Sequence, residues 1–221
     1  MTAMIDTGGG ANPEIWIRAT AQMTERRAER LAAAANARTR HIRLIIQDIH
    51  HPHNVSACLR SAEAFGVNYC DVVCLHETFA PSTVTRGVHH WLTIQKHDSI
   101  AQAAATIKGA GYKIAAATVA PSALPLSDLP LDQPIAVLFA NEKNGPAPEW
   151  LPHVDLWFTI PMAGLVESLN VSVSAAITLF TLTTRARREL PAERYFLTLL
   201  ERHALLTNWA NHEATFGTPT A

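Results

Sequence analysis

One stretch of the chain sets its fold class: residues 44–67, which read LIIQDIHHPHNVSACLRSAEAFGV. It opens with a short apolar run at 44–46, passes through a loop that contains Pro52, and continues into a helix expected over 55–65. The same pattern then repeats, with apolar runs at 72–75, 114–117, 135–139 and 156–160 and helices expected at 99–108 and 168–187. This alternation predicts an α/β domain with a mainly parallel sheet and helices on both faces.

Arginine-rich segments flank this predicted domain. Of the 14 arginines, 12 lie between residues 18 and 43 or between 185 and 202, so the net charge of −1 divides into +3 for 1–60, −5 for 61–184 and +1 for 185–221. We expect helices at 13–36 and 191–211, and hence three parts: a helical N-terminal extension (1–40), the α/β domain (41–184) and a helical C-terminal extension (185–221). The arginines indicate either a surface for a polyanion such as RNA or solvated helix faces with acid–base pairs.

Several classes of protein are excluded or disfavoured. No apolar run reaches the roughly 18 to 20 residues of a membrane helix, and the N-terminus lacks the basic and apolar regions of a signal peptide, so we expect a cytoplasmic protein without a membrane partner. The two common glycine-rich nucleotide motifs and the GxSxG hydrolase motif are missing. His50, His51 and His53 lie near Asp48, but adjacent side chains point apart in extended chain, so we expect no metal site.

Three polar loops follow predicted strands, at the edge where open α/β sheets bind ligands. They read QDIHHPHN (47–54), ANEKNGPAPEW (140–150) and PMAGLVESLN (161–170), and each combines proline or glycine with amides or hydroxyls. Each also leads to a helix, whose free N–H groups can hold polar or anionic ligand atoms. A ligand site is therefore expected where these loops meet.

Three segments resemble, in the same order and at the same separations, the motifs of the SPOUT class of RNA methyltransferases, SpoU branch: HNVSACLRSAEAFGV (53–67), NEKNG (141–145) and IPMAGLVESLNVSVSAA (160–176). The resemblance covers residues 41–184. It implies a SPOUT fold with a C-terminal trefoil knot, S-adenosyl-L-methionine as cofactor, and a homodimer whose interface completes each active site. It further implies 2′-O-methylation of a ribose in tRNA, with guanosine 18 in the D-loop as the expected target. A ribosomal RNA substrate and a non-catalytic RNA-binding module are the alternatives.

The resemblance also implies roles for particular residues. The expected catalytic residues are Arg60, Asn54, Glu142, Ser168 and Asn170. The expected cofactor-binding residues are Ala117, Thr118, Ala140, Asn141, Gly145, Ile160, Met162, Ser168 and Leu169. From the arginine-rich flanks we expect RNA contacts from Arg26, Arg27, Arg30, Arg38, Arg40, Arg187 and Arg188.

Two of these assignments raise chemical questions. A guanidinium with a pKa above about 12 is a poor base, so we expect Arg60 to hold a phosphate and to stabilise the developing alkoxide. The family usually has glycine at the position of Ala140, and glycine there normally lets the backbone approach a ligand closely.

Overall fold

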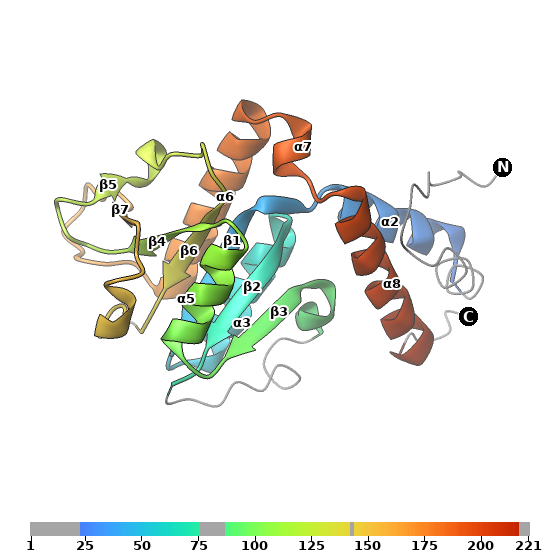
Figure 1. Cartoon of the computed structure of the whole chain (residues 1–221), viewed down its shortest axis with the longest axis horizontal. Helices are drawn as coiled ribbons and strands as arrows, with labels where there is room; N and C mark the ends of the chain where they lie inside the picture. The colour runs from blue at the N-terminus through green and yellow to red at the C-terminus, as the bar shows by residue number, and fades with distance from the viewer. Residues whose placement is uncertain (1–22, 76–86, 142–143, 217–221) are drawn as a thin grey trace. The chain divides into compact units, whose positions relative to one another are not determined.

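The computed structural model describes residues 23–75, 87–141 and 144–216. The chain divides into two compact units (Figure 1). Of the described residues, 23–38 and 196–216 belong to one unit, and those between 39 and 195 belong to the other.

The larger unit is built on a seven-stranded sheet in which every neighbouring pair is parallel. The strands are β1 (Thr39–Gln47), β2 (Val67–Val73), β3 (Thr93–His97), β4 (Lys113–Ala117), β5 (Leu124–Pro125), β6 (Ile135–Phe139) and β7 (Leu156–Thr159). Their order in the sheet is β3-β2-β1-β6-β4-β7-β5. Because all strands run the same way, their carboxyl ends, and the loops that follow them, lie at one edge.

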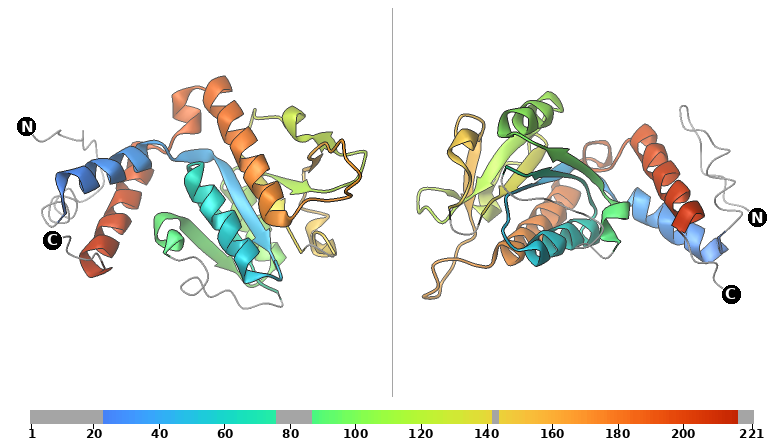
Figure 2. Two further views of the ribbon diagram at one scale, coloured as in Figure 1. Left: turned by 180° about the vertical axis from the view of Figure 1, so that it is seen from behind. Right: turned by 90° about the horizontal axis from the view of Figure 1, so that it is seen from below.

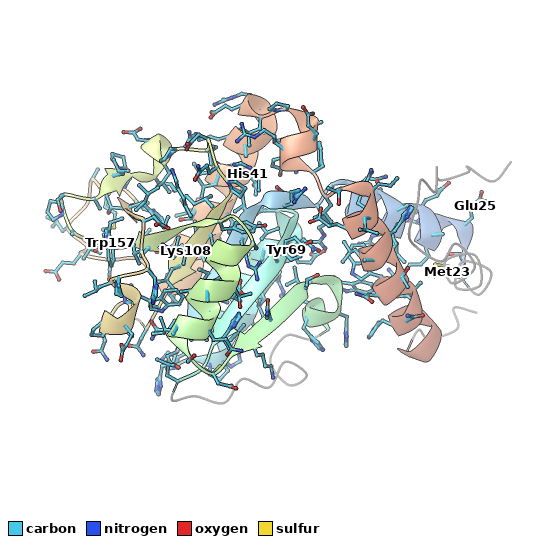
Figure 3. All side chains as sticks on the ribbon, in the orientation of Figure 1. Met23, Glu25, His41, Tyr69, Lys108 and Trp157 are labelled. Atoms are coloured by element: carbon cyan, nitrogen blue, oxygen red, sulfur yellow. The ribbon has the colours of Figure 1, made fainter. Side chains whose placement is uncertain are left out.

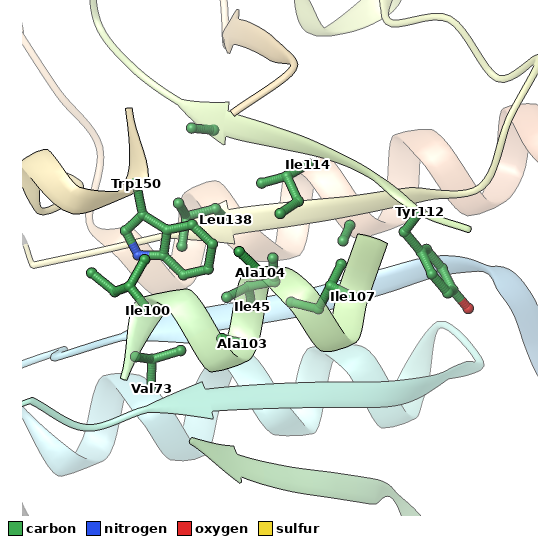
Figure 4. Packing of buried hydrophobic residues seen from close by; sticks show 12 residues of the cluster. Ile45, Val73, Ile100, Ala103, Ala104, Ile107, Tyr112, Ile114, Leu138 and Trp150 are labelled. Carbon is green, nitrogen blue, oxygen red and sulfur yellow. The ribbon is translucent and has the colours of Figure 1, made fainter. Parts of the chain in front are cut away.

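Helices cover both faces of this sheet, as the alternating pattern predicted. Helices α3 (Pro52–Ala64) and α6 (Val171–Glu189) pack together on one face, and α5 (Ile100–Gly109) lies on the other (Figures 1 and 2). On the α5 side, Ile100 and Ile107 pack with Ile45, Ile114 and Trp150 in a buried cluster (Figure 4). Short helices complete the unit: η1 (Val88–Trp91), η2 (Leu126–Asp128), η3 (Pro148–Trp150) and α7 (Ala192–Tyr195).

A buried charged network crosses the sheet beneath α5. The Arg43 guanidinium donates to both carboxyl oxygens of Asp71, and a ring nitrogen of His97 lies 2.7 Å from Asp71 Oδ1. Arg43 also lies over the rings of Tyr69 and Tyr112 (Figure 3 labels Tyr69). Burial lowers the pKa of Arg43, but the hydrogen bond and the charge of Asp71 outweigh burial and leave that pKa raised. The arginine therefore stays charged inside the sheet, where removal of Asp71 alone would be costly.

The smaller unit contains helices α2 (Glu25–Asn36) and α8 (Leu199–Phe216), which pack against each other. Arg27 Nη2 donates to Glu213 Oε1 at 2.6 Å, and Arg202 Nη1 donates to Asn36 Oδ1 at 2.8 Å. Two long-range polar contacts thus join the two helices.

The sequence prediction was wrong about helix limits at both ends of the chain. The helix expected from residue 13 begins, within the described residues, at Glu25, because Thr24 has extended backbone and its side chain caps the helix; residues 13–22 lie outside the described residues. The single helix expected over 191–211 is two helices, α7 and α8. Thr198 and Glu201 form a reciprocal capping box that starts α8. This T-x-x-E signal is visible in the sequence.

Strands β3 and β5 were also missed. The residues of β3 are mostly exposed because this strand forms an edge of the sheet, so it lacks the apolar run by which the central strands were recognised. Strand β5 has only two residues, which is too short to be recognised from an apolar run.

Candidate active site

Two of the predicted catalytic residues, 116 positions apart, are hydrogen-bonded to each other. Asn170 Nδ2 donates to Asn54 Oδ1 at 3.3 Å. Asn54 lies in the first turn of α3 and Asn170 directly precedes α6, so the bond joins the starts of the two helices on the same face of the sheet. The first and third polar loops therefore meet, as expected from their place at the carboxyl edge.

Asn170 has a second role as the N-cap of α6. Its Oδ1 accepts from the Ser172 backbone N–H at 2.8 Å and from the Ser172 hydroxyl at 2.6 Å. Because Oδ1 faces these donors, Nδ2 points to Asn54, and the orientation of the amide is set by the cap. The helix expected to start at residue 168 thus starts at Val171, and Ser168 lies exposed in the preceding loop.

Asn54 is not the cap of its own helix. Helix α3 begins at Pro52, and His51 is its N-cap residue. The Asn54 backbone N–H donates to His51 O at 2.8 Å as part of the first turn. This placement leaves the Asn54 side chain directed to Asn170 rather than to its own backbone.

Arg60 lies on the exposed side of α3, six residues after Asn54. Six residues correspond to about 9 Å along the helix and about 240° around it, so the two side chains leave the helix in different directions. Among the described residues, Arg60 has no hydrogen bond or ion pair, either with Asn54 and Asn170 or with any other residue. One copy of the chain therefore does not join Arg60 to the asparagine pair by a hydrogen bond.

The predicted cofactor residues lie after three adjacent strands, β6, β4 and β7. Ala117 ends β4, and the next backbone N–H, of Thr118, donates to Phe158 O in β7 at 2.9 Å. Ile160 follows β7, and Met162, Ser168 and Leu169 lie in the loop between β7 and α6. These residues, from segments distant in the sequence, share one edge of the sheet.

The loop after β6 closes on itself. Gly145 N–H donates to Asn141 O at 2.9 Å, Asn144 N–H donates to Asn141 Oδ1 at 3.3 Å, and Gly145 has a φ of 65°, which glycine adopts readily. Ala140 precedes this turn and is 9% exposed. Of the described residues other than glycine, only Asp48 has positive φ, so the backbone at Ala140 suits alanine and does not require the glycine usual in the family. Glu142 lies outside the described residues.

Sequence reasoning missed two residues that connect these loops, Gln47 and Asp48. The Asp48 backbone oxygen accepts from Asn141 Nδ2 at 3.2 Å, and Gln47 Oε1 accepts from the Ala147 N–H at 3.0 Å. Asp48 has a φ of 43°, an uncommon value outside glycine. In the sequence, the only indication of this role is that two polar residues directly follow an apolar run.

The predicted RNA-binding arginines differ in how accessible they are. Arg26 and Arg30 are exposed on α2, whereas Arg27 is paired with Glu213. Arg38 is 2% exposed and lies over the Trp209 ring, which argues against direct contact with RNA.

The remaining three arginines of the set belong to the larger unit. Arg40 is partly buried. Arg187 stacks on the Tyr195 ring and donates to its hydroxyl at 3.2 Å, and Arg188 is exposed and paired with Glu189 at 2.9 Å. An exposed ion pair such as Arg188–Glu189 contributes little to stability, whereas the ring on which Arg187 lies is buried.

Two further observations concern metals and membranes. Within residues 23–75, 87–141 and 144–216, no group of three or more His, Cys, Asp or Glu residues is arranged to hold a metal ion. Over the same residues, no helix combines the length and apolar character needed to cross a membrane.

Comparison with known proteins adds a family and several relatives. A family model described as the SpoU rRNA Methylase family matches residues 41–180. A tRNA (guanosine(18)-2′-O)-methyltransferase of Thermus thermophilus is 33% identical over 162 residues, which cover 72% of this chain and 82% of the relative. The protein of the same name from Borreliella burgdorferi is 30% identical over 168 residues, covering 75% and 77%.

The fold has a similar counterpart among solved structures. The crystal structure of the A. aeolicus TrmH/SpoU tRNA modifying enzyme has a TM-score of 0.75 and 26% sequence identity, with 86% of this chain and 97% of that chain covered. The match thus extends beyond the segment that carries the three motifs.

Proposed function

The chain belongs to the SpoU rRNA methylase family, and on that premise we propose that it methylates the 2′-hydroxyl of a ribose in tRNA, with guanosine 18 of the D-loop as the target. The observation that carries this proposal is the Asn54–Asn170 hydrogen bond, because it brings two of the three sequence motifs to one point beside the sheet edge. The tRNA substrate is supported by the names of relatives that match over about three quarters of the chain. A tRNA substrate also implies a cytoplasmic protein.

The edge formed by β6, β4 and β7 fits S-adenosylmethionine as the cofactor. It offers backbone groups at Asn141 and Gly145, which are hydrogen-bonded to each other beside the small residue Ala140, and an exposed apolar side chain, Met162. Such a combination suits a ligand with both an adenine ring and polar atoms. The bound cofactor would supply an electrophilic methyl group, so the protein has only to bind, orient and exclude water.

Arg60 and the asparagine pair are proposed to act on the ribose. The Arg60 guanidinium, without a protein partner in the described residues, can hold a phosphate of the RNA in a planar, bidentate contact and stabilise charge on the 2′-oxygen. Asn54, held by Asn170, would position the nucleotide beside it. The 2′-proton would pass to the phosphate or to a neighbouring group, because a guanidinium is a poor base.

A homodimer is the proposed active form. Helix α6 buries one apolar face, which includes Ala175 and Leu179, against its own unit, but Val173, Ile177 and Phe180 form a second apolar stripe that is exposed. Phe180 contacts the ring of Phe65 at the end of α3, the helix that carries Arg60. A second copy seated on this stripe would bury it and could supply the groups that one copy does not bring to Arg60.

We also propose the trefoil knot and the three-part organisation implied by the family resemblance. Strands β6 and β7 come late in the chain but lie between strands that precede them in sequence. A knotted chain requires a late segment to be inserted in this way. The arginines of α2 and of the end of α6 are proposed to contact tRNA outside the catalytic domain.

Methyl transfer to an unmodified tRNA transcript tests the proposed function. Labelled S-adenosylmethionine is supplied, and the product is mapped by the resistance of the bond next to a 2′-O-methyl ribose to alkaline cleavage. Wild-type protein should protect one ribose in the D-loop, and Arg60→Ala should not. Arg194→Ala, which removes an exposed arginine outside the three motifs and outside the expected RNA contacts, is the matched control and should retain the same product.

Each other outcome would change the conclusion. Methyl transfer to ribosomal RNA but not to tRNA would show that ribosomal RNA is the substrate. A protein that binds S-adenosylmethionine without transferring its methyl group to either RNA, or that does not bind it, would contradict the proposal and favour a non-catalytic RNA-binding module.

A further inference from the structure

Two residues at the end of β1 link the loops of the carboxyl edge. Gln47 is the last residue of β1 and is 4% exposed, and Asp48, which follows it, is 8% exposed. Polar side chains are seldom so buried unless their hydrogen bonds are satisfied, so the partners of this pair indicate its role.

The pair holds the loop after β6 at two points. The Asp48 carbonyl accepts from Asn141 Nδ2 at 3.2 Å, and Gln47 Oε1 accepts from the Ala147 N–H at 3.0 Å. Between these anchors, Asn144 and Gly145 bond back to Asn141. The position of this loop is therefore set by β1 rather than by β6 alone.

Asp48 also holds the end of β2 and the residues that follow it directly. The Asp48 N–H donates to Val73 O at 3.1 Å, and Asp48 Oδ1 accepts from the Leu75 N–H at 2.8 Å. These contacts accompany the positive φ of Asp48, a conformation that aspartate and asparagine tolerate better than most residues. The turn directs the chain toward α3, where Asn54 lies.

Gln47 and Asp48 also contact each other. Gln47 Nε2 donates to Asp48 Oδ2 at 3.3 Å, so the amide oxygen of Gln47 faces Ala147 and each carboxyl oxygen of Asp48 has a donor. In this contact Gln47 is the donor and Asp48 is the acceptor. A change of the donor or the acceptor at either residue would also displace the side chain of the other, and would therefore disturb both loops.

We propose that Gln47 and Asp48 are positioning residues that place Asn141 and Ala147, and with Asn141 the residues Asn144 and Gly145 bonded to it, for cofactor binding and fix them relative to the start of α3. The inference rests on the proposed function, because that function makes this loop part of the cofactor site. Neither residue touches the reacting atoms. Their effect is to hold backbone groups at the carboxyl edge in one position, so that the cofactor does not have to order them on binding.

Exchange of the donor and the acceptor tests this role. Gln47→Glu retains the acceptor for Ala147 but places two carboxyl groups side by side, and Asp48→Asn retains the acceptor for Leu75 but places two amide donors face to face. The double variant Gln47→Glu/Asp48→Asn restores one donor and one acceptor and keeps the net charge. Asn also tolerates the positive φ at position 48.

The measurement is calorimetric titration of S-adenosylmethionine into the full-length protein, together with binding of unmodified tRNA. Each single variant should raise the Kd for the cofactor by about tenfold or more, and the double variant should return it to within about threefold of wild type. The Kd for tRNA should be unchanged in all variants that have a native-like thermal unfolding transition. Gln95→Glu is the matched control, because Gln95 also accepts a side-chain hydrogen bond but lies on β3; it should leave cofactor affinity unchanged.

The results separate failure of this inference from failure of the proposed function. If wild-type protein does not bind S-adenosylmethionine, the proposed function fails and the inference falls with it. If wild type binds but the single variants bind equally well, or if the double variant is no better than the singles, the positioning role is wrong and the proposed function stands.

Discussion

Asn170 donates a hydrogen bond to Asn54 across 116 residues of sequence while its other amide atom caps helix α6. One side chain thus carries two separable roles, a structural role at the helix and a positioning role toward the motif that contains Arg60. The two roles can be tested apart, because they use different atoms.

Asn170→Ser should separate them. Serine caps a helix about as well as asparagine but is too short to reach Asn54, so the free energy of unfolding should stay within about 0.5 kcal/mol of wild type while methyl transfer falls by about tenfold or more. Asn170→Ala should in addition lose about 1 kcal/mol of stability. Urea denaturation and single-turnover transfer assays measure the two effects. Full activity of Asn170→Ser would show that the bond to Asn54 is not needed.

Arg60→Lys should lose most activity although it keeps the positive charge. A lysine cannot reproduce the planar, bidentate contact with a phosphate, so kcat should fall by about a hundredfold with little change in tRNA affinity. Arg30→Lys should be close to wild type in the same steady-state assay. Wild-type turnover by Arg60→Lys would remove the guanidinium from the proposed mechanism.

Binding of tRNA should weaken steeply with salt. If four to six phosphates are neutralised, the slope of log K against log salt concentration should be about −3 to −5. Arg26→Gln and Arg30→Gln, at exposed positions of α2, should each make the slope shallower by about one unit in filter-binding assays. Arg38→Gln should instead lower stability and leave the slope unchanged, because Arg38 is buried against Trp209. A slope that does not respond to Arg26 or Arg30 would place the RNA surface elsewhere.

Charge on the exposed stripe of α6 should prevent dimer formation. Phe180 is 56% exposed, and Phe180→Asp would place an unpaired carboxylate in the proposed interface, so the protein should sediment as a monomer and lose methyl transfer. Leu200 on α8 is 59% exposed, and Leu200→Asp, the matched control, should remain dimeric and active. A monomeric wild-type protein that is fully active would contradict the proposed dimer.

The stability of the larger unit should decrease in mild acid because of His41 (Figure 3). Burial lowers the pKa of His41, whose Nε2 lies 3.0 Å from Leu131 O. The folded protein therefore binds fewer protons than the unfolded chain below about pH 6.5, and the free energy of unfolding must fall as the pH drops through that range. His41→Gln, which can still donate to Leu131 O, should lose less stability than wild type between about pH 7.5 and 5.5 in urea titrations. Parallel pH profiles for the two proteins would exclude His41 as the cause.

Much of the larger unit could be predicted from local patterns. The central strands are buried because helices cover both faces of the sheet. Buried strands require apolar residues, and these appear in the sequence as the short runs at 44–46, 114–117 and 135–139. Strand β3 could not be found in the same way, since an exposed edge strand needs no apolar run. The start of α8, by contrast, has a local signal, because the Thr198–Glu201 capping box is a T-x-x-E pattern in the sequence.

The parallel α/β architecture, the three polar loops and the family motifs within them can be predicted from the sequence, because periodicity and motif spacing are properties of neighbouring residues. Which of these residues meet depends on the tertiary structure. The strand order places β6 beside β1, and this brings Asn141 to Asp48 and Ala147 to Gln47. Likewise, Arg38 and Arg30 are equally charged in sequence, and only packing against Trp209 buries one of them. Contacts between distant segments depend on strand order and packing, which no local pattern of residues records.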